Sequence, residues 1–265
     1  MPGKRLSRNS MATRKIKNNR IARLFVKTAL TGESITLNTN QTHYLRQVLR
    51  LRSGDPLLLF NGMGDERHAR VETLARSGCK IRITDISQPL PESPLRLSLL
   101  QSIAKADAMD LIIQKSAELG VSSVFPILSS FSVVKIDEGR VARKIAHWEK
   151  IAQSACEQSG RHCPPIIHAP INFRDILGNI PSTATCIVLR PGSSKTLQSF
   201  SQNFPHISDL YMLIGPEGGF SPSELEDAKK ADFHFIDLGT RILRTETAAL
   251  AACTLAQYLW GDLSV

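Results

Sequence analysis

The chain has 265 residues, of which 42% are hydrophobic and 22% charged, an ordinary folded composition with room for two domains. No apolar run approaches the ~20 residues of a membrane span, and the first residues lack the apolar core of a secretory signal. Its five cysteines include no C-x-x-C pair, which indicates free thiols in a reducing compartment and predicts a cytoplasmic protein without a membrane partner.

The net charge of +9 comes almost entirely from the N-terminal segment. Residues 1–23 carry eight Lys and Arg and no acidic residue, whereas residues 24–93 carry a net +2 and residues 94–265 a net −1. We expect residues 1–20 to form a disordered basic tail. Such a tail suits an RNA-binding arm or an organellar transit peptide, and a leader before a true start at Met11 is the plainer alternative.

Residues 21–88 are predicted to form a small β-rich domain, because short runs of branched residues are separated by turn signals. The strands are expected at 56–60, 68–74 and 79–86. One amphipathic helix is predicted over 42–51, and short strands with one helix suggest a small barrel. Residues 89–94 hold three prolines and are interpreted as a linker.

Residues 95–265 alternate between strand and helix patterns, which predicts an α/β fold with a mainly parallel sheet. The strands are expected at 95–103, 122–128, 184–189, 209–214 and 233–238. The helices are expected at 107–120, 137–160, 222–230 and 247–260.

The G-P-E-G-G run at residues 215–219 lies between a predicted strand and a well-marked helix start, where Ser221 and Glu224 form a capping box. Open α/β sheets bind ligands at this end of their strands, and glycines let a ligand approach the backbone closely. The run lacks both common nucleotide signatures, and the carboxylate of Glu217 would repel phosphate. It favours a ligand with hydroxyls, amines or positive charge, although a plain turn is an open alternative.

A second run, G-T-R-I-L-R-T-E-T-A-A at residues 239–249, also follows a predicted strand and opens a helix. Two loops of this kind are able to face each other and hold one ligand. The alternative is an ordinary polar helix start, with Thr245 as cap and Glu246 favoured by the helix dipole.

Together the two runs resemble the paired signature of SPOUT-class RNA methyltransferases, and more closely the ribosomal RNA small-subunit methyltransferase E family, which methylates uridine N3. The similarity continues in I-Q-K-S-A-E-L-G-V (113–121) and K-I-A-Q-S-A-C-E-Q-S-G-R (150–161). It reaches H-Y-L-R-Q-V-L-R-L-R-S-G-D (43–55), which resembles that family's PUA-like barrel, and it covers residues 21 to 265.

The resemblance implies a trefoil knot in residues 95–265, S-adenosylmethionine as cofactor, and a homodimer with its active site at the interface. The implied RNA partner is small-subunit rRNA within an assembled or late-assembly subunit. The residues that would bind the cofactor are Leu189, Ile214, Gly215, Pro216, Glu217, Gly218, Gly219, Leu238, Gly239, Ile242, Leu243, Thr247 and Ala248. Leu238, Ile242 and Leu243 would supply an apolar wall for the adenine.

Catalysis on uridine requires loss of the N3 proton and stabilisation of negative charge on the ring. Arg244 is our candidate for the stabilising cation. Glu246 is a weaker candidate for a base or for orienting Arg244. A simple ion pair at the helix start is the alternative reading of both residues.

Basic residues outside these loops are candidates for RNA contacts, with solvated surface charge as the alternative. They are Arg23, Arg46, Arg50, Arg52, Lys105 and Arg161. Cys156, His162, Cys163 and His168 do not have the spacing of a known zinc module, so we expect no metal. Two other functions are open: methylation of tRNA or another rRNA base, and a non-catalytic RNA-binding assembly factor.

Overall fold

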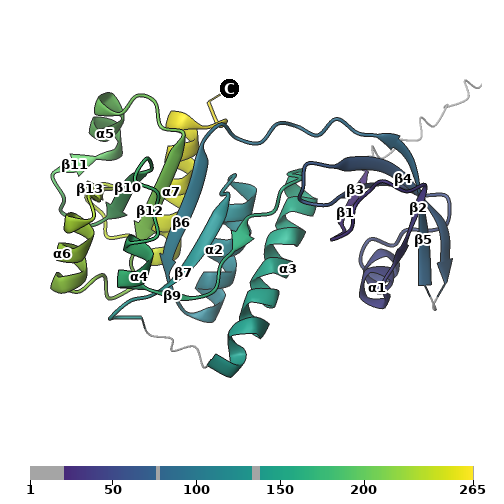
Figure 1. The fold of residues 1–265 in the computed structure, drawn as a ribbon, viewed down its shortest axis with the longest axis horizontal. Helices are drawn as coiled ribbons and strands as arrows, with labels where there is room; N and C mark the ends of the chain where they lie inside the picture. The colour runs from purple at the N-terminus through teal and green to yellow at the C-terminus, as the bar shows by residue number, and fades with distance from the viewer. Residues whose placement is uncertain (1–20, 76–77, 133–137, 265) are drawn as a thin grey trace, which may run out of the picture.

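A computed structural model describes residues 21–75, 78–132 and 138–264, which form two sheets with their helices (Figure 1). The disorder predicted for residues 1–20 falls outside this range.

The smaller sheet has five strands in the order β1-β3-β4-β5-β2, and it packs with one helix around its own apolar core. Its elements are β1 (Ala22–Phe25), β2 (Ser34–Leu37), α1 (Thr39–Gln47), β3 (Pro56–Phe60), β4 (Glu66–Ala75) and β5 (Gly78–Ile86). Strand β1 is parallel to β3, and the other pairs are antiparallel. The three predicted strands are confirmed, whereas β1 and β2 were not predicted.

Helix α1 begins and ends earlier than the predicted range of 42–51. Asn38 is its N-cap and forms a capping box with Gln41, so the helix starts at Thr39. Arg50 has a φ of 53°, a left-handed conformation that ends any helical path there.

The larger sheet runs β11-β13-β10-β12-β6-β7-β8, with β9 also pairing to β7, and every one of these pairs is parallel. Its strands are β6 (Arg96–Ser102), β7 (Ser123–Leu128), β8 (Ile166–Ile167), β9 (Ile171–Asn172), β10 (Thr185–Leu189), β11 (Lys195–Thr196), β12 (Asp209–Ile214) and β13 (His234–Asp237). The predicted parallel sheet is confirmed. The knot implied by the resemblance stays a prediction.

Helices cover both faces of this sheet because side chains alternate along each strand. The helices are α2 (Ala106–Glu118), α3 (Val141–Ser159), α4 (Phe173–Leu177), α5 (Leu197–Asn203), α6 (Pro222–Lys230) and α7 (Thr245–Trp260). Along β12, Leu210, Met212 and Ile214 join the core under α2, α3 and α7, whereas Tyr211 and Leu213 join the core under α4 and α6 (Figure 1).

The position of β10 brings the two runs that carry the family signature to one edge of the sheet: the first signature loop, residues 215–219, and the second signature loop, residues 239–249. β12 and β13 lie on either side of β10, and all three strands run in the same direction. The loops that follow them therefore open side by side at the carboxyl ends of the strands, where such sheets bind ligands.

Candidate functional site

A cavity of about 530 Å³ lies at this edge, between the loops that follow β10, β12 and β13 and the start of α7. This volume is typical of small-molecule sites. Ten of the thirteen predicted cofactor residues line it: Leu189, Ile214, Gly215, Pro216, Glu217, Gly219, Leu238, Ile242, Leu243 and Ala248. The structure thus brings the two predicted loops together around one space.

Three predicted cofactor residues do not line the cavity. A Cβ on Gly218 would lie 3.1 Å from the Cβ of Phe131. The absence of a side chain at Gly218 therefore allows its close contact with the loop after β7. Gly239 turns the chain after β13 with a φ of 112°, and its N–H donates to Asp237 Oδ1 at 3.0 Å. Thr247 is exposed on α7.

Gly219 is the loop residue whose backbone conformation and open surroundings suit the close approach of a ligand that was predicted for the loop. Its φ is 71°, and an added Cβ would meet no atom within 4 Å. This backbone conformation is strained for a residue with a side chain. The peptide of Gly219 therefore borders the open space of the cavity.

The walls of the cavity combine buried and exposed apolar side chains. Ile214 and Ile236 are buried in the floor. Ile242 lines the same space, yet its side chain is 88% exposed. A ligand or a partner that covers this side chain would gain the free energy of burying its apolar surface.

Charged side chains stand at the edge of the cavity without internal partners. Among the described residues, the side chains of Glu217, Arg241 and Arg244 make no hydrogen bond or ion pair. Arg244 lines the cavity and Glu246 does not. The alternative ion pair between these two residues is not formed, which leaves the guanidinium of Arg244 available to a ligand.

Thr245 has a role that sequence reasoning missed. It is not the helix cap, because Arg244 occupies that position. Its Oγ1 donates to the Gly215 carbonyl oxygen at 2.7 Å and accepts from Gln101 Nε2 at 3.0 Å. Thr245 is 4% exposed and Gln101 is fully buried. The pair ties the end of β6 to the first signature loop and to α7.

The helix start after the first loop is as predicted. Ser221 Oγ accepts from the Glu224 N–H, and the Glu224 carboxylate accepts from the Ser221 N–H at 2.8 Å. Glu224 also accepts from the N–H of Ser130 at 2.7 Å. The capping box therefore anchors the loop after β7 against the cavity loop.

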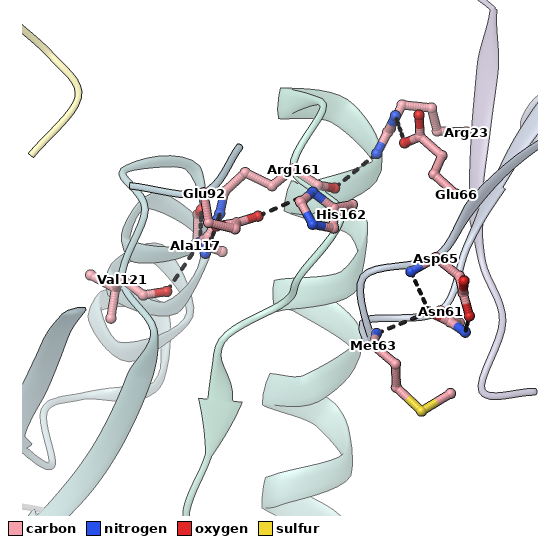
Figure 2. Close-up of polar contacts among 10 residues, drawn as sticks. All are labelled: Arg23, Asn61, Met63, Asp65, Glu66, Glu92, Ala117, Val121, Arg161 and His162. Atoms are coloured by element: carbon pink, nitrogen blue, oxygen red, sulfur yellow. Dashed lines mark hydrogen bonds and ion pairs between the residues drawn. The ribbon is translucent and has the colours of Figure 1, made fainter. Parts of the chain in front are cut away.

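The predicted RNA contacts divide into two groups. Arg50, Arg52 and Lys105 are exposed, and Arg46 is partly exposed. The side chains of Arg23 and Arg161 are only 10% and 14% exposed, and both are held by internal partners (Figure 2). These internal bonds give Arg23 and Arg161 a structural role, and an RNA contact by either residue stays a prediction.

Of the cysteines and histidines considered as metal ligands, His162 and Cys163 lie in one cluster among the described residues, together with Glu92. Burial raises the pKa of the Cys156 thiol to about 12, and the ring of His168 stacks on Phe125 with centroids 3.8 Å apart. His162 and Cys163 lie beside Glu92, with their ligand atoms within 4.8 Å of one another. Glu92 is already bound by Arg161 through two N–H groups.

Comparison with known proteins identifies the class to which this fold and cavity belong. Residues 91–257 match an RNA methyltransferase domain, and residues 37–84 match an RNA methyltransferase PUA domain. A protein from Legionella pneumophila, solved with the cofactor SAM, superimposes with a TM-score of 0.86 at 34% identity, over 92% of this chain and all of that one.

More specific relatives place the chain within that class. Ribosomal RNA small subunit methyltransferase E of Buchnera aphidicola from Schizaphis graminum is 35% identical over 92% of this chain and 99% of its own length. That of Bacillus subtilis is 30% identical over 87% and 89%. The Neisseria gonorrhoeae enzyme, bound to S-adenosyl methionine, has a TM-score of 0.85 at 36% identity over 92% and 99%. The chain belongs to the ribosomal RNA small subunit methyltransferase E family.

Proposed function

We propose that this protein transfers the methyl group of S-adenosylmethionine to small-subunit ribosomal RNA, at N3 of a uridine. The observation that carries the proposal is the cavity enclosed by the two signature loops, with apolar walls and an unpaired arginine at its edge. The cofactor-bound relatives of the same family support the choice of cofactor.

The residues that line the cavity fit this cofactor. Leu238, Ile242 and Leu243 offer apolar surface to an adenine ring. Gly219, where an added Cβ would meet no atom within 4 Å, offers its peptide group to the adenosyl portion, and Gly215 lines the same space. The carboxylate of Glu217 suits the positive charge of the amino or sulfonium group and disfavours a phosphate. When bound, S-adenosylmethionine supplies an electrophilic methyl group.

The chemistry left to the protein is to make uridine N3 nucleophilic. The deprotonated imide carries negative charge on the ring and its carbonyl oxygens, and a nearby guanidinium stabilises that charge. Arg244 is free to do so because it has no internal partner among the described residues. Glu246 lies outside the cavity lining, which makes it the weaker candidate for a base. Holding N3 close to the methyl donor supplies a further part of the rate.

A second subunit would complete the site. Helix α7 exposes 42% of Leu255 and 58% of Tyr258, more apolar surface than a helix with one core-facing stripe needs. We propose that these residues form a homodimer interface and that the partner helps to cover Ile242. No helix in the described part of the chain is long and apolar enough to cross a membrane. A cytoplasmic location stays a prediction.

The test is methylation of rRNA and of assembled small subunits with labelled S-adenosylmethionine, followed by mass mapping of the modified nucleotide. We expect one N3-methyluridine in small-subunit rRNA. Arg244→Ala should lower kcat on the order of 100-fold and leave cofactor affinity unchanged, since the charge it stabilises appears only in the transition state. Methylation of tRNA or of another base would show that the target is wrong, and cofactor binding without RNA methylation would favour an assembly factor.

A further inference from the structure

The C-terminal end of α3 holds the two domains together. Helix α3 packs against α2 in the larger domain and contacts β1 in the smaller one. Glu157 and Arg161 are four residues apart near this end, and each bonds to residues outside α3 (Figure 2 shows Arg161).

All three nitrogens of the Arg161 guanidinium are used within the larger domain and the linker. Nη1 donates to the carbonyl oxygens of Ala117 at 2.7 Å and Val121 at 3.0 Å, at the C-terminal end of α2 where a cation is favoured. Nε and Nη2 donate to Glu92 Oε2 at 2.9 and 2.6 Å. Four of its five N–H groups are thereby occupied, and the side chain is only 14% exposed, which leaves little of it for an RNA phosphate.

The backbone of the same residue binds the smaller domain. The carbonyl oxygen of Arg161 accepts from Arg23 Nη2 at 2.9 Å. Arg23, on β1, pairs with Glu66 on β4 and lies over the Phe60 ring, 4.8 Å from its centroid. A continuous chain of contacts therefore runs from Glu66 through Arg23 and Arg161 to Glu92 in the linker (Figure 2).

Two further contacts cross the same boundary. Glu157 accepts from the N–H of Phe25 at 3.0 Å and from the Tyr44 hydroxyl at 2.9 Å. Phe60 of the smaller domain is fully buried within the core of the larger one, with Phe25 packed against it. An apolar centre with buried ionic contacts around it restricts rotation of one domain on the other far more than a surface ion pair does.

We propose that Arg161 is a positioning residue: it fixes the orientation of the PUA domain on the methyltransferase domain, so that RNA held by the first is presented to the cavity of the second. The inference rests on the proposed function. The competing role is a direct contact between Arg161 and RNA phosphate.

The positioning role and the direct phosphate contact of Arg161 predict different effects of replacing Glu92. A positioning role requires both partners, so Arg161→Gln and Glu92→Gln should each lower kcat/KM for RNA about tenfold, and the double variant should lose no more than one single variant. A direct contact requires only the arginine, so Glu92→Gln would leave kcat/KM for RNA unchanged, which would overturn the proposal. Cofactor affinity should be unchanged in all three variants.

The salt dependence of RNA binding and the substitution of Arg161 by lysine also distinguish the two roles. Loss of a phosphate contact lowers the log–log salt slope of RNA binding by about 0.7. An unchanged slope in Arg161→Gln is the expected result, and a reduced slope contradicts the proposal. Arg161→Lys should be as defective as Arg161→Gln, because an ammonium cannot span the carboxylate and two carbonyl oxygens. Recovery by lysine would indicate a phosphate contact.

Calorimetry of the full chain without RNA gives an independent readout. Wild-type protein should unfold in one transition, and Arg161→Gln should unfold in two, as the domains uncouple. Lys27→Gln is the matched control: Lys27 bonds Glu149 on α3 across the same boundary at 3.1 Å but is 70% exposed, so we expect no effect. A single transition in Arg161→Gln would refute the coupling. A wild-type protein that methylates no RNA would refute the proposed function, and calorimetry would still decide the coupling.

Discussion

Replacing Thr245 by valine tests how the cavity is held in shape. Valine has nearly the volume of threonine, so the change removes a hydroxyl and creates no void. The Gly215 carbonyl oxygen loses a donor that lies 2.7 Å away, while Gln101 Nε2 keeps its second bond to the Ser102 carbonyl oxygen at 2.9 Å. A buried group left without its partner costs about 1–3 kcal/mol, so we take about 2 kcal/mol as the total effect.

This cost can appear in two places. If the Gly215 carbonyl stays where it is, the free energy of unfolding without cofactor falls by about 2 kcal/mol. If the carbonyl turns to water, the loop is displaced and affinity for S-adenosylmethionine falls instead, by up to about 30-fold, since 1.4 kcal/mol corresponds to a factor of ten. The two losses should add up to about 2 kcal/mol.

Chemical denaturation and isothermal titration calorimetry measure the two quantities on the same protein. Thr245→Ser is the matched control, because it keeps the hydroxyl and loses one methyl group, worth about 0.8 kcal/mol of stability. We expect it to bind the cofactor as the wild type does. A valine variant with wild-type stability and wild-type affinity would show that the Gln101–Thr245 pair does not support the loop.

Three further predictions concern the cavity loop, the domain boundary and the subunit interface. Gly219→Val should abolish measurable cofactor binding in titration calorimetry, because a φ of 71° is strained for valine and its side chain would occupy the open space left for the cofactor. A folded variant with normal affinity would remove Gly219 from the site. Burial raises the pKa of the Glu157 carboxyl, so the folded state keeps a proton that the unfolded chain has lost. Stability should therefore fall as pH rises from the ordinary glutamate pKa to the raised one, and denaturation profiles of Glu157→Gln should lack this decline. Leu255→Arg should shift light scattering from dimer to monomer and reduce methylation with it, and a fully active monomeric wild type would contradict the interface.

Local signals made the cavity predictable from sequence. Ser221 and Glu224 are three residues apart, and the loop glycines precede them directly, so the strand-loop-helix unit could be read without knowing the fold. Each strand and helix predicted after residue 95 is present, with shifts at the ends. Strands such as β8 and β11 were missed because two residues carry no periodicity.

Contacts between distant residues could not be predicted in this way. Gln101 looks like a polar interruption in an apolar strand, and its partner Thr245 lies 144 residues away. Arg161 looks like an exposed cation after a helix, and only the folded chain shows the carboxylate and carbonyls around it. A basic residue in sequence has no marker that separates an RNA contact from an internal ion pair.

The bond between Gln101 and Thr245 also sets the order in which the protein matures during synthesis. Strand β6 leaves the ribosome well before Thr245, which lies 144 residues after Gln101 at the start of α7. The first signature loop has no donor from Thr245 until that helix has been made and has packed against α2. Contacts of such long range form late in folding. A nascent chain therefore cannot close the cavity in this form until α7 has been made.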